Sequence, residues 1–176
     1  HLSIRRQRQM CIRDSPVTGR LFLCSDRIHN YQKGYNFAEN KTSMLDLLYH
    51  RRSTRKFLDK PVEVEKVKQL ITAGLLAPSS KNNRPWEFLL VDDADKLKAL
   101  AYTKPHGSSF LSNAPLAIIV LGSPGKSDVW VEDCSIASTL IQVEAESLGL
   151  GSCWVQVHNR SHDEEISAAQ YLRRHF

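Results

Sequence analysis

The sequence lacks any apolar run approaching the ~20 residues that a membrane-spanning helix needs, so no membrane span is expected. It also lacks a secretory signal, because its early apolar stretch, Leu21-Phe22-Leu23-Cys24, is too short and too interrupted to serve as one. We therefore expect a cytoplasmic protein. Of its 176 residues, 41% are hydrophobic and 24% are charged, which is typical of one globular domain with a real core.

Patterns that bind metals or activate a nucleophile are absent as well. The sequence contains no H-E-x-x-H, no phosphate-binding Walker loop, and no Ser, His and Asp in a recognisable catalytic arrangement. Cys134 and Cys153 lie in apolar surroundings without C-x-x-C spacing, so we expect buried free thiols and no metal site. No residue is assigned as a catalytic acid, base or nucleophile.

The excess of positive charge is confined to one end of the chain. The net charge is +5, but residues 1–43 hold eight Lys or Arg against three Asp or Glu, and the remaining residues hold sixteen of each. A nucleic-acid-binding domain would carry its basic excess on the folded surface. We therefore expect no nucleic-acid partner.

Residues 1–43 show no sustained helical or strand period, and the chain begins with His1 rather than Met. The stretch from Gln7 to Ser15 resembles a translated sequencing adapter, and Met44 opens the first clear amphipathic pattern. We therefore predict that residues 1–43 are a non-native or disordered segment whose deletion leaves folding intact. Residues 44–176 are predicted to form the domain.

Hydrophobic periodicity predicts helices and strands throughout residues 44–176. Helices are expected at about 44–50, 63–77, 93–102, 128–148 and 163–174, and strands at 86–91, 116–121 and 152–157. Strands and helices neither alternate strictly nor separate cleanly along the chain. The pattern therefore favours an α+β layered sandwich.

Three guanidinium groups stand within five residues, Arg51-Arg52-Ser53-Thr54-Arg55, directly after the first predicted helix. Arginine presents a planar fork of donors that matches phosphate oxygens, and neighbouring hydroxyl groups can donate to the oxygens that remain. Such clusters also occur at solvated helix ends. On its own, the segment could therefore be either a phosphate site or a solvated helix end.

A second polar segment, Ala77-Pro78-Ser79-Ser80-Lys81-Asn82-Asn83-Arg84-Pro85-Trp86, follows a helix that Pro78 is expected to stop. Its small hydroxyl and amide side chains can bond the polar edge of a planar ligand. Together with the arginines, this segment predicts a nucleotide-like cofactor site.

These two segments, with Gly149-Leu150-Gly151-Ser152-Cys153-Trp154, closely resemble the nitroreductase family of FMN-dependent oxidoreductases. The resemblance runs from about Met44 to the last residue and depends on the order and spacing of the three motifs. It implies a layered α+β sandwich with helices around a central, mostly antiparallel sheet, assembled as a homodimer. It also implies FMN as cofactor and NAD(P)H as co-substrate.

The resemblance further assigns the site residues. The FMN phosphate and ribityl chain would be held by Arg51, Arg52, Ser53 and Arg55. The other subunit would contribute Pro78, Ser79, Ser80 and Asn82. The flavin ring would lie along Trp154, Val155 and Gln156, with a backbone N–H near its N5 atom. The flavin would pass hydride from NAD(P)H to a small nitroaromatic, quinone or similar electron-poor acceptor.

Several alternatives stay open. Related flavoproteins perform reductive dehalogenation, oxidative ring fragmentation or dehydrogenation, and Arg84 stands where the family often has glutamine, so the substrate is not predicted. The arginines could instead hold a phosphorylated metabolite without redox chemistry, or the chain could be a non-functional truncated reading frame. Because family members continue beyond Phe176, we expect the domain to be incomplete at its C-terminus.

Overall fold

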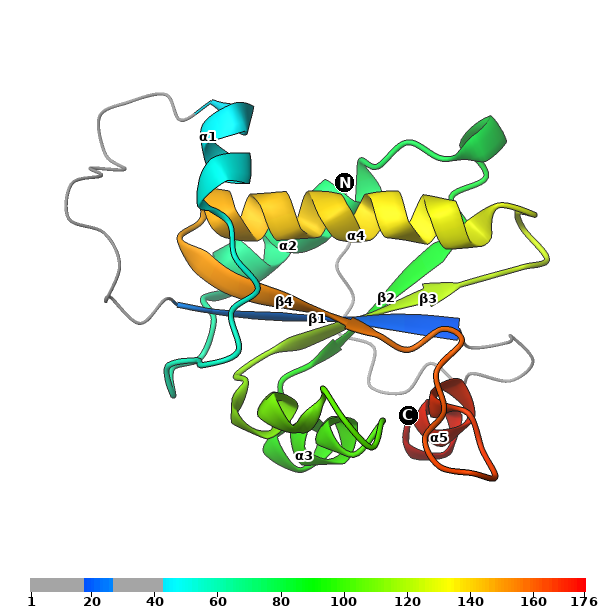
Figure 1. The fold of residues 1–176 in the computed structure, drawn as a ribbon. Coiled ribbons are helices and arrows are strands. Elements are labelled where there is room, and N and C mark those ends of the chain that lie inside the picture. The colour runs from blue at the N-terminus through cyan, green and yellow to red at the C-terminus, as the bar shows by residue number, and fades with distance from the viewer. Residues whose placement is uncertain (1–17, 27–42) are drawn as a thin grey trace.

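A computed structural model gives the backbone of residues 18–26 and the backbone and side chains of residues 43–176. Helices surround one sheet (Figure 1). In chain order the elements are β1 (Thr18–Asp26), α1 (Met44–His50), α2 (Val64–Leu75), η1 (Ser80–Asn82), β2 (Trp86–Val91), α3 (Ala94–Ala101), η2 (Ser109–Asn113), β3 (Ala117–Gly122), α4 (Trp130–Ser147), β4 (Leu150–Gln156) and α5 (Ala168–His175).

The described strands lie in the order β2-β3-β1-β4, and every neighbouring pair is antiparallel. β1 is an interior strand, since Leu21 lies opposite Ile119 of β3 on one side and Val155 of β4 on the other. The expected α+β class with a central antiparallel sheet is confirmed. β2 and β4 are the two edge strands.

The expectation that residues 1–43 contain no regular structure is wrong for Thr18–Asp26, which form the strand β1. The run Leu21-Phe22-Leu23-Cys24 shows no alternation, and its hydrogen-bond partners lie about a hundred residues further along the chain. The local sequence pattern therefore gives little indication that this segment is a strand. The rest of residues 1–42 lies outside the described part, and a domain boundary at residue 44 stays a prediction.

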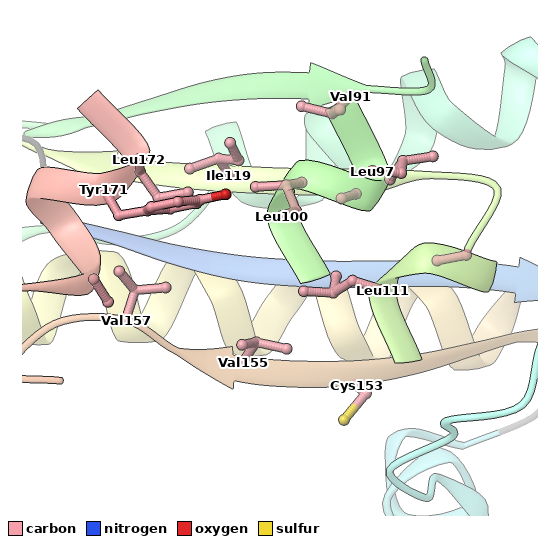
Figure 2. Packing of buried hydrophobic residues seen from close by; sticks show 13 residues of the cluster. Val91, Leu97, Leu100, Leu111, Ile119, Cys153, Val155, Val157, Tyr171 and Leu172 are labelled. Atoms are coloured by element: carbon pink, nitrogen blue, oxygen red, sulfur yellow. The ribbon is translucent and has the colours of Figure 1, made fainter. Parts of the chain in front are cut away.

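The sheet separates two apolar clusters. On one face, α2 and α4 cover a cluster, here the α2–α4 cluster, that includes Leu70, Trp86, Ile118, Val120 and Ile141. On the other face, α3, η2 and α5 cover the α3–α5 cluster, whose members include Leu97, Leu100, Leu111, Ile119, Val155 and Leu172 (Figure 2). Consecutive strand residues alternate between the two clusters, as the period of a strand requires.

α4 lies across one face of the sheet (Figure 1). It fully buries Ala137, Ile141 and Ala145, which recur every four residues and therefore share one side of the helix. Gly122 of β3 lets the first turn of α4 pack closely on the sheet, because a Cβ at this position would lie 2.3 Å from the Trp130 ring. The prediction of a long central helix here is confirmed.

Polar caps define where the helices begin. Ser43 and Asp46 form a capping box at α1, and the Asp93 side chain caps α3. α5 begins later than the predicted residue 163, because Ser167 and Gln170 form a capping box at Ala168. Asp163 instead closes a turn, its Oδ1 accepting the N–H groups of residues 165 and 166.

Candidate functional site

The arginine segment, residues 51–55, runs beside the first part of β4. Ser53 forms a parallel bridge with Ser152, and the N–H of Thr54 donates to the carbonyl of Ser152 at 2.9 Å. Glycine is required next to this contact, since a Cβ at Gly151 would lie 2.8 Å from the Thr54 side chain. β4 therefore fixes the backbone that carries the arginines.

The guanidinium groups of this segment have no carboxylate partner among residues 43–176. Arg52 Nη1 donates to the carbonyls of Tyr49 and Arg51 at 2.7 and 2.8 Å. The guanidinium carbon of Arg55 lies 5.8 Å from the centre of the Phe110 ring, a cation–π contact. The exposed Arg51 side chain makes no hydrogen bond within the same residues. These charges are available to an anion.

Cys153 indicates which face of the sheet these cations approach. Its buried side chain belongs to the α3–α5 cluster, and burial raises the pKa of its thiol (Figure 2). The positive charge of Arg55 lowers the pKa of this thiol and so opposes part of the rise. A hydrogen bond with Ser53 and the charge of Lys104 lower it by less. Burial, and then Arg160, lowers the pKa of Lys104. Positive charge therefore gathers beside β4 on the face that α3 and α5 cover.

The second predicted segment forms a loop, residues 78–84, with an unusual backbone. The φ angles of Lys81, Asn82 and Arg84 are +51°, +56° and +45°, in the left-handed region that residues other than glycine seldom adopt. Ser79 Oγ accepts the N–H of Arg84 at 2.9 Å, and Asn82 Oδ1 accepts from Arg84 Nε at 2.9 Å. These two bonds tie the loop to itself, and leave the Ser79 hydroxyl proton and the Asn82 amide group as donors.

Asp133 also contacts this loop, and sequence reasoning missed it. The side chain is 3% exposed and lies in the first turn of α4. Its Oδ1 accepts the N–H of Ser80 at 2.9 Å, and its Oδ2 accepts from the hydroxyl of Ser127 at 2.9 Å. A single aspartate inside a helical pattern gives no signal of such a role, because its partner Ser80 is 53 residues away in sequence.

β4 turns the three predicted ring-contacting residues to opposite faces. Trp154 Nε1 donates to Gln156 Oε1 at 3.0 Å, and Gln156 Nε2 donates to the carbonyl of His158 at 2.9 Å. The Val155 side chain is instead buried in the α3–α5 cluster (Figure 2). Val155 can therefore contact a cofactor only through its backbone.

Within one chain the arginine segment and the 78–84 loop lie apart. The arginine segment is bonded to Ser152, just after α4 ends, whereas the loop is bonded to Asp133 in the first turn of α4. At about 1.5 Å per residue, the helix from Asp133 to Ser147 spans roughly 21 Å. Figure 1 accordingly shows α1 near one end of α4 and η1 near the other.

Metal and membrane features are absent from the part of the chain that the structure describes. No three His, Cys, Asp or Glu side chains gather in a metal-binding arrangement there, and no helix is long and apolar enough to cross a membrane. Cys134 and Cys153 are buried free thiols, as predicted. The other two cysteines lie outside the described side chains, and a cytoplasmic location stays a prediction.

An antiparallel sheet between two helical layers defines an α+β protein, and the arginine segment beside its edge strand β4 has no carboxylate partner among residues 43–176. Comparison with known proteins identifies the family. Residues 48–106 match the Nitroreductase family. A protein of Archaeoglobus fulgidus, provisionally named NADH dehydrogenase/NAD(P)H nitroreductase, is 37% identical over 132 residues, which are 73% of this chain and 74% of that protein.

Solved structures agree with this assignment. The FMN-dependent nitroreductase of Clostridium difficile R20291 is 50% identical with a TM-score of 0.73, over 74% of this chain and 76% of that one. A nitroreductase with bound FMN from Bacteroides fragilis is 27% identical with a TM-score of 0.61, over 77% of this chain and 80% of that one. The chain belongs to the nitroreductase family, and it is an oxidoreductase.

Proposed function

We propose that this protein is an FMN-dependent oxidoreductase that passes hydride from NAD(P)H through the flavin to an electron-poor small molecule. The relatives named above support FMN and NAD(P)H as the redox partners. The observation that carries the proposal is the cluster of arginines that has no carboxylate partner in residues 43–176 and is held against β4 by the Ser53–Ser152 bridge.

The residues present fit the phosphate group of FMN. Arg51 and Arg55 are exposed and offer forked donors, while Ser53 adds a hydroxyl next to the bridge with β4. One nitrogen of Arg52 already donates to two backbone carbonyls, so this side chain stabilises the backbone of the segment. Its positive charge also adds to that of the segment. A dianionic phosphate would replace water around these cations without displacing an ion pair from the described part of the chain.

FMN, when bound, supplies the hydride chemistry, and the protein supplies orientation and charge. The donors would be the arginine segment for the phosphate, the backbone of β4 for the ring, and the Ser79 hydroxyl and Asn82 amide for polar edges. Trp154 and Gln156 are linked to each other by a hydrogen bond, so their side chains form one preorganised edge along β4. No acid or base in the chain is assigned a proton-transfer step.

We further propose that two chains share each site. The arginine segment and the 78–84 loop lie at opposite ends of α4, so a second copy is the natural source of the loop for each arginine segment. α1 supports this proposal because none of its residues is buried, and its apolar side chains Met44, Leu45, Leu48 and Tyr49 are between 47% and 68% exposed. Such a face gains stability when a partner covers it.

The acceptor is proposed only as a class: a small nitroaromatic, quinone or similar electron-poor molecule. The names of the relatives favour reduction of a nitro group. Reductive dehalogenation on the same fold would need the same flavin site and would differ in the acceptor, whereas dehydrogenation would make the small molecule the hydride donor to the flavin. Once flavin binding is established, assays with several acceptors, and with candidate donors in place of NAD(P)H, therefore separate these reactions.

Flavin identification tests the proposal. The purified protein, incubated with a mixture of FMN, FAD and riboflavin and then desalted, should retain FMN, because the site offers donors for one phosphate and no G-x-G-x-x-G turn. Heat release and chromatography identify the bound flavin, and NADH or NADPH should bleach its visible absorbance. Retention of FAD, retention of no flavin, or binding without bleaching would each contradict the proposal.

A further inference from the structure

We infer that Asp133 is a positioning residue for the cofactor site: its carboxylate holds the 78–84 loop in the backbone conformation that presents Ser79 and Asn82 to the flavin. This inference deepens the proposed function and rests on it. Asp133 itself is buried beneath the loop and is not expected to touch the cofactor.

The loop needs such support because its backbone is strained. Lys81, Asn82 and Arg84 all have φ near +50°, within four consecutive positions. The left-handed region is sterically unfavourable for every residue other than glycine, though less so for asparagine than for lysine or arginine. Strain of this kind persists only where the surroundings fix it, and such residues are concentrated at binding sites.

Asp133 is the fixed group to which the loop is bonded. Its two oxygens accept separate donors at 2.9 Å, the N–H of Ser80 at the start of the strained turn and the hydroxyl of Ser127 before α4. The Ser127 bond satisfies the second oxygen of this buried carboxylate. The position in the first turn of α4 places the carboxylate charge near the positive end of the helix dipole. The loop's other side-chain bonds, made by Ser79 and Asn82, run within the loop and do not anchor it.

A position on α4 also connects the loop to the rest of the site. α4 packs on the face of the sheet opposite Cys153, and Trp130, at its start, makes an edge contact with His158 at 5.0 Å between ring centres. His158 in turn accepts the hydrogen bond from Gln156 of β4. The same helical turn therefore fixes the loop and the end of the strand proposed to lie along the flavin.

The test compares three variants of the full chain. Asp133→Ala removes both bonds. Asp133→Asn can keep them, because its amide oxygen accepts from Ser80 and its NH₂ group donates to the Ser127 hydroxyl, which also accepts. Ser127→Ala removes a buried bond to the same carboxylate and leaves the Ser80 bond intact, so it is the matched control for loss of stability without loss of the loop anchor.

Two readouts are measured for each variant: the dissociation constant of FMN, and the rate of tryptic cleavage after Lys81 in the flavin-free protein, relative to cleavage after Lys56. Both lysines are exposed, but only Lys81 lies in the loop. Asp133→Ala should weaken FMN binding about tenfold or more and should accelerate cleavage at Lys81 selectively. Asp133→Asn and Ser127→Ala should stay within about threefold of the original protein.

Unchanged FMN binding and unchanged relative cleavage in Asp133→Ala would overturn the inference. Equal effects of Asp133→Ala and Ser127→Ala on both readouts would overturn it as well, because the carboxylate would then only stabilise the region. If the original protein binds no FMN, the proposed function fails and this inference with it. Should Asp133→Ala not fold, Asp133→Glu displaces the carboxylate by one methylene and gives the same comparison.

Discussion

At the residue scale, the proposed phosphate site is expected to depend on single side chains of the arginine segment. Arg51 and Arg55 are exposed, and neither forms an ion pair among residues 43–176. A charge-assisted hydrogen bond to phosphate is stronger than one between neutral groups, and no salt bridge within residues 43–176 has to be broken to form it. Ser53 and Thr54 contribute differently, since their backbones hold the segment on β4.

Replacing Arg51 or Arg55 with Ala should weaken FMN binding by about 1.5–3 kcal/mol each, or roughly ten- to a hundredfold in the dissociation constant. The loss should shrink at high salt, because exposed charges are screened. Titration of flavin fluorescence measures both effects. Arg173→Ala, an exposed arginine on α5, is the matched control and should bind FMN normally. Unchanged affinity in both site variants would make the segment a solvated helix end.

Among the elements, those with a strong local signal were predictable. β2 has the predicted bounds, and the helix predicted at about 128–148 is present as α4, because apolar runs and helical periodicity are local properties. β1 was missed because its neighbours in the sheet come from distant parts of the chain. The start of α5 was misplaced because an aspartate turn precedes the true cap.

The two segments proposed to form the site could be recognised in the sequence, and the resemblance assigned them to different subunits, but local pattern could not predict where they lie in the fold. The arginine segment and the polar loop stand out as runs of donors, and their order along the chain carries the family resemblance. Their placement at opposite ends of α4 depends on how the helix crosses the sheet, which no local pattern encodes. The contact of Asp133 with the loop and the burial of the Val155 side chain depend on the same long-range packing.

β1 should matter for stability because it is the only described strand that pairs with both β3 and β4. Leu21→Pro removes one N–H from this interior strand and leaves its acceptor unpaired, a loss of about 2 kcal/mol or more. Thermal and urea unfolding measure it. Val64→Pro is the matched control, since Val64 is exposed, occupies the first position of α2 and follows an extended residue.

If Leu21→Pro unfolds like the original protein, β1 is dispensable, and the expectation that residues 1–43 can be deleted without loss of folding is restored. A melt of the protein lacking residues 1–43 should then also be unchanged. A large loss in the deletion variant together with a large loss in Leu21→Pro would establish β1 as part of the fold.

At the scale of the whole molecule, one chain carries the two segments proposed as half-sites, together with an exposed apolar helix. The arginine segment and the 78–84 loop are each held rigidly, one by β4 and the other by α4. α1 leaves four large apolar side chains, Met44, Leu45, Leu48 and Tyr49, mostly exposed. A second copy that covers α1 would account for both features, and binding of FMN should then depend on protein concentration.

Complementation between two damaged proteins tests the shared FMN site most directly. Arg51→Ala damages one half-site, and the double variant Ser79→Ala, Ser80→Ala damages the other, so each homodimer should be nearly inactive at a limiting FMN concentration. Mixing equal amounts and allowing subunits to exchange should give heterodimers with one intact site. NAD(P)H oxidation with a nitroaromatic acceptor should recover to about a quarter of the original activity. If heterodimers form, as shown by native mass spectrometry, and no activity returns, the two half-sites do not meet across an interface and the shared-site proposal is wrong.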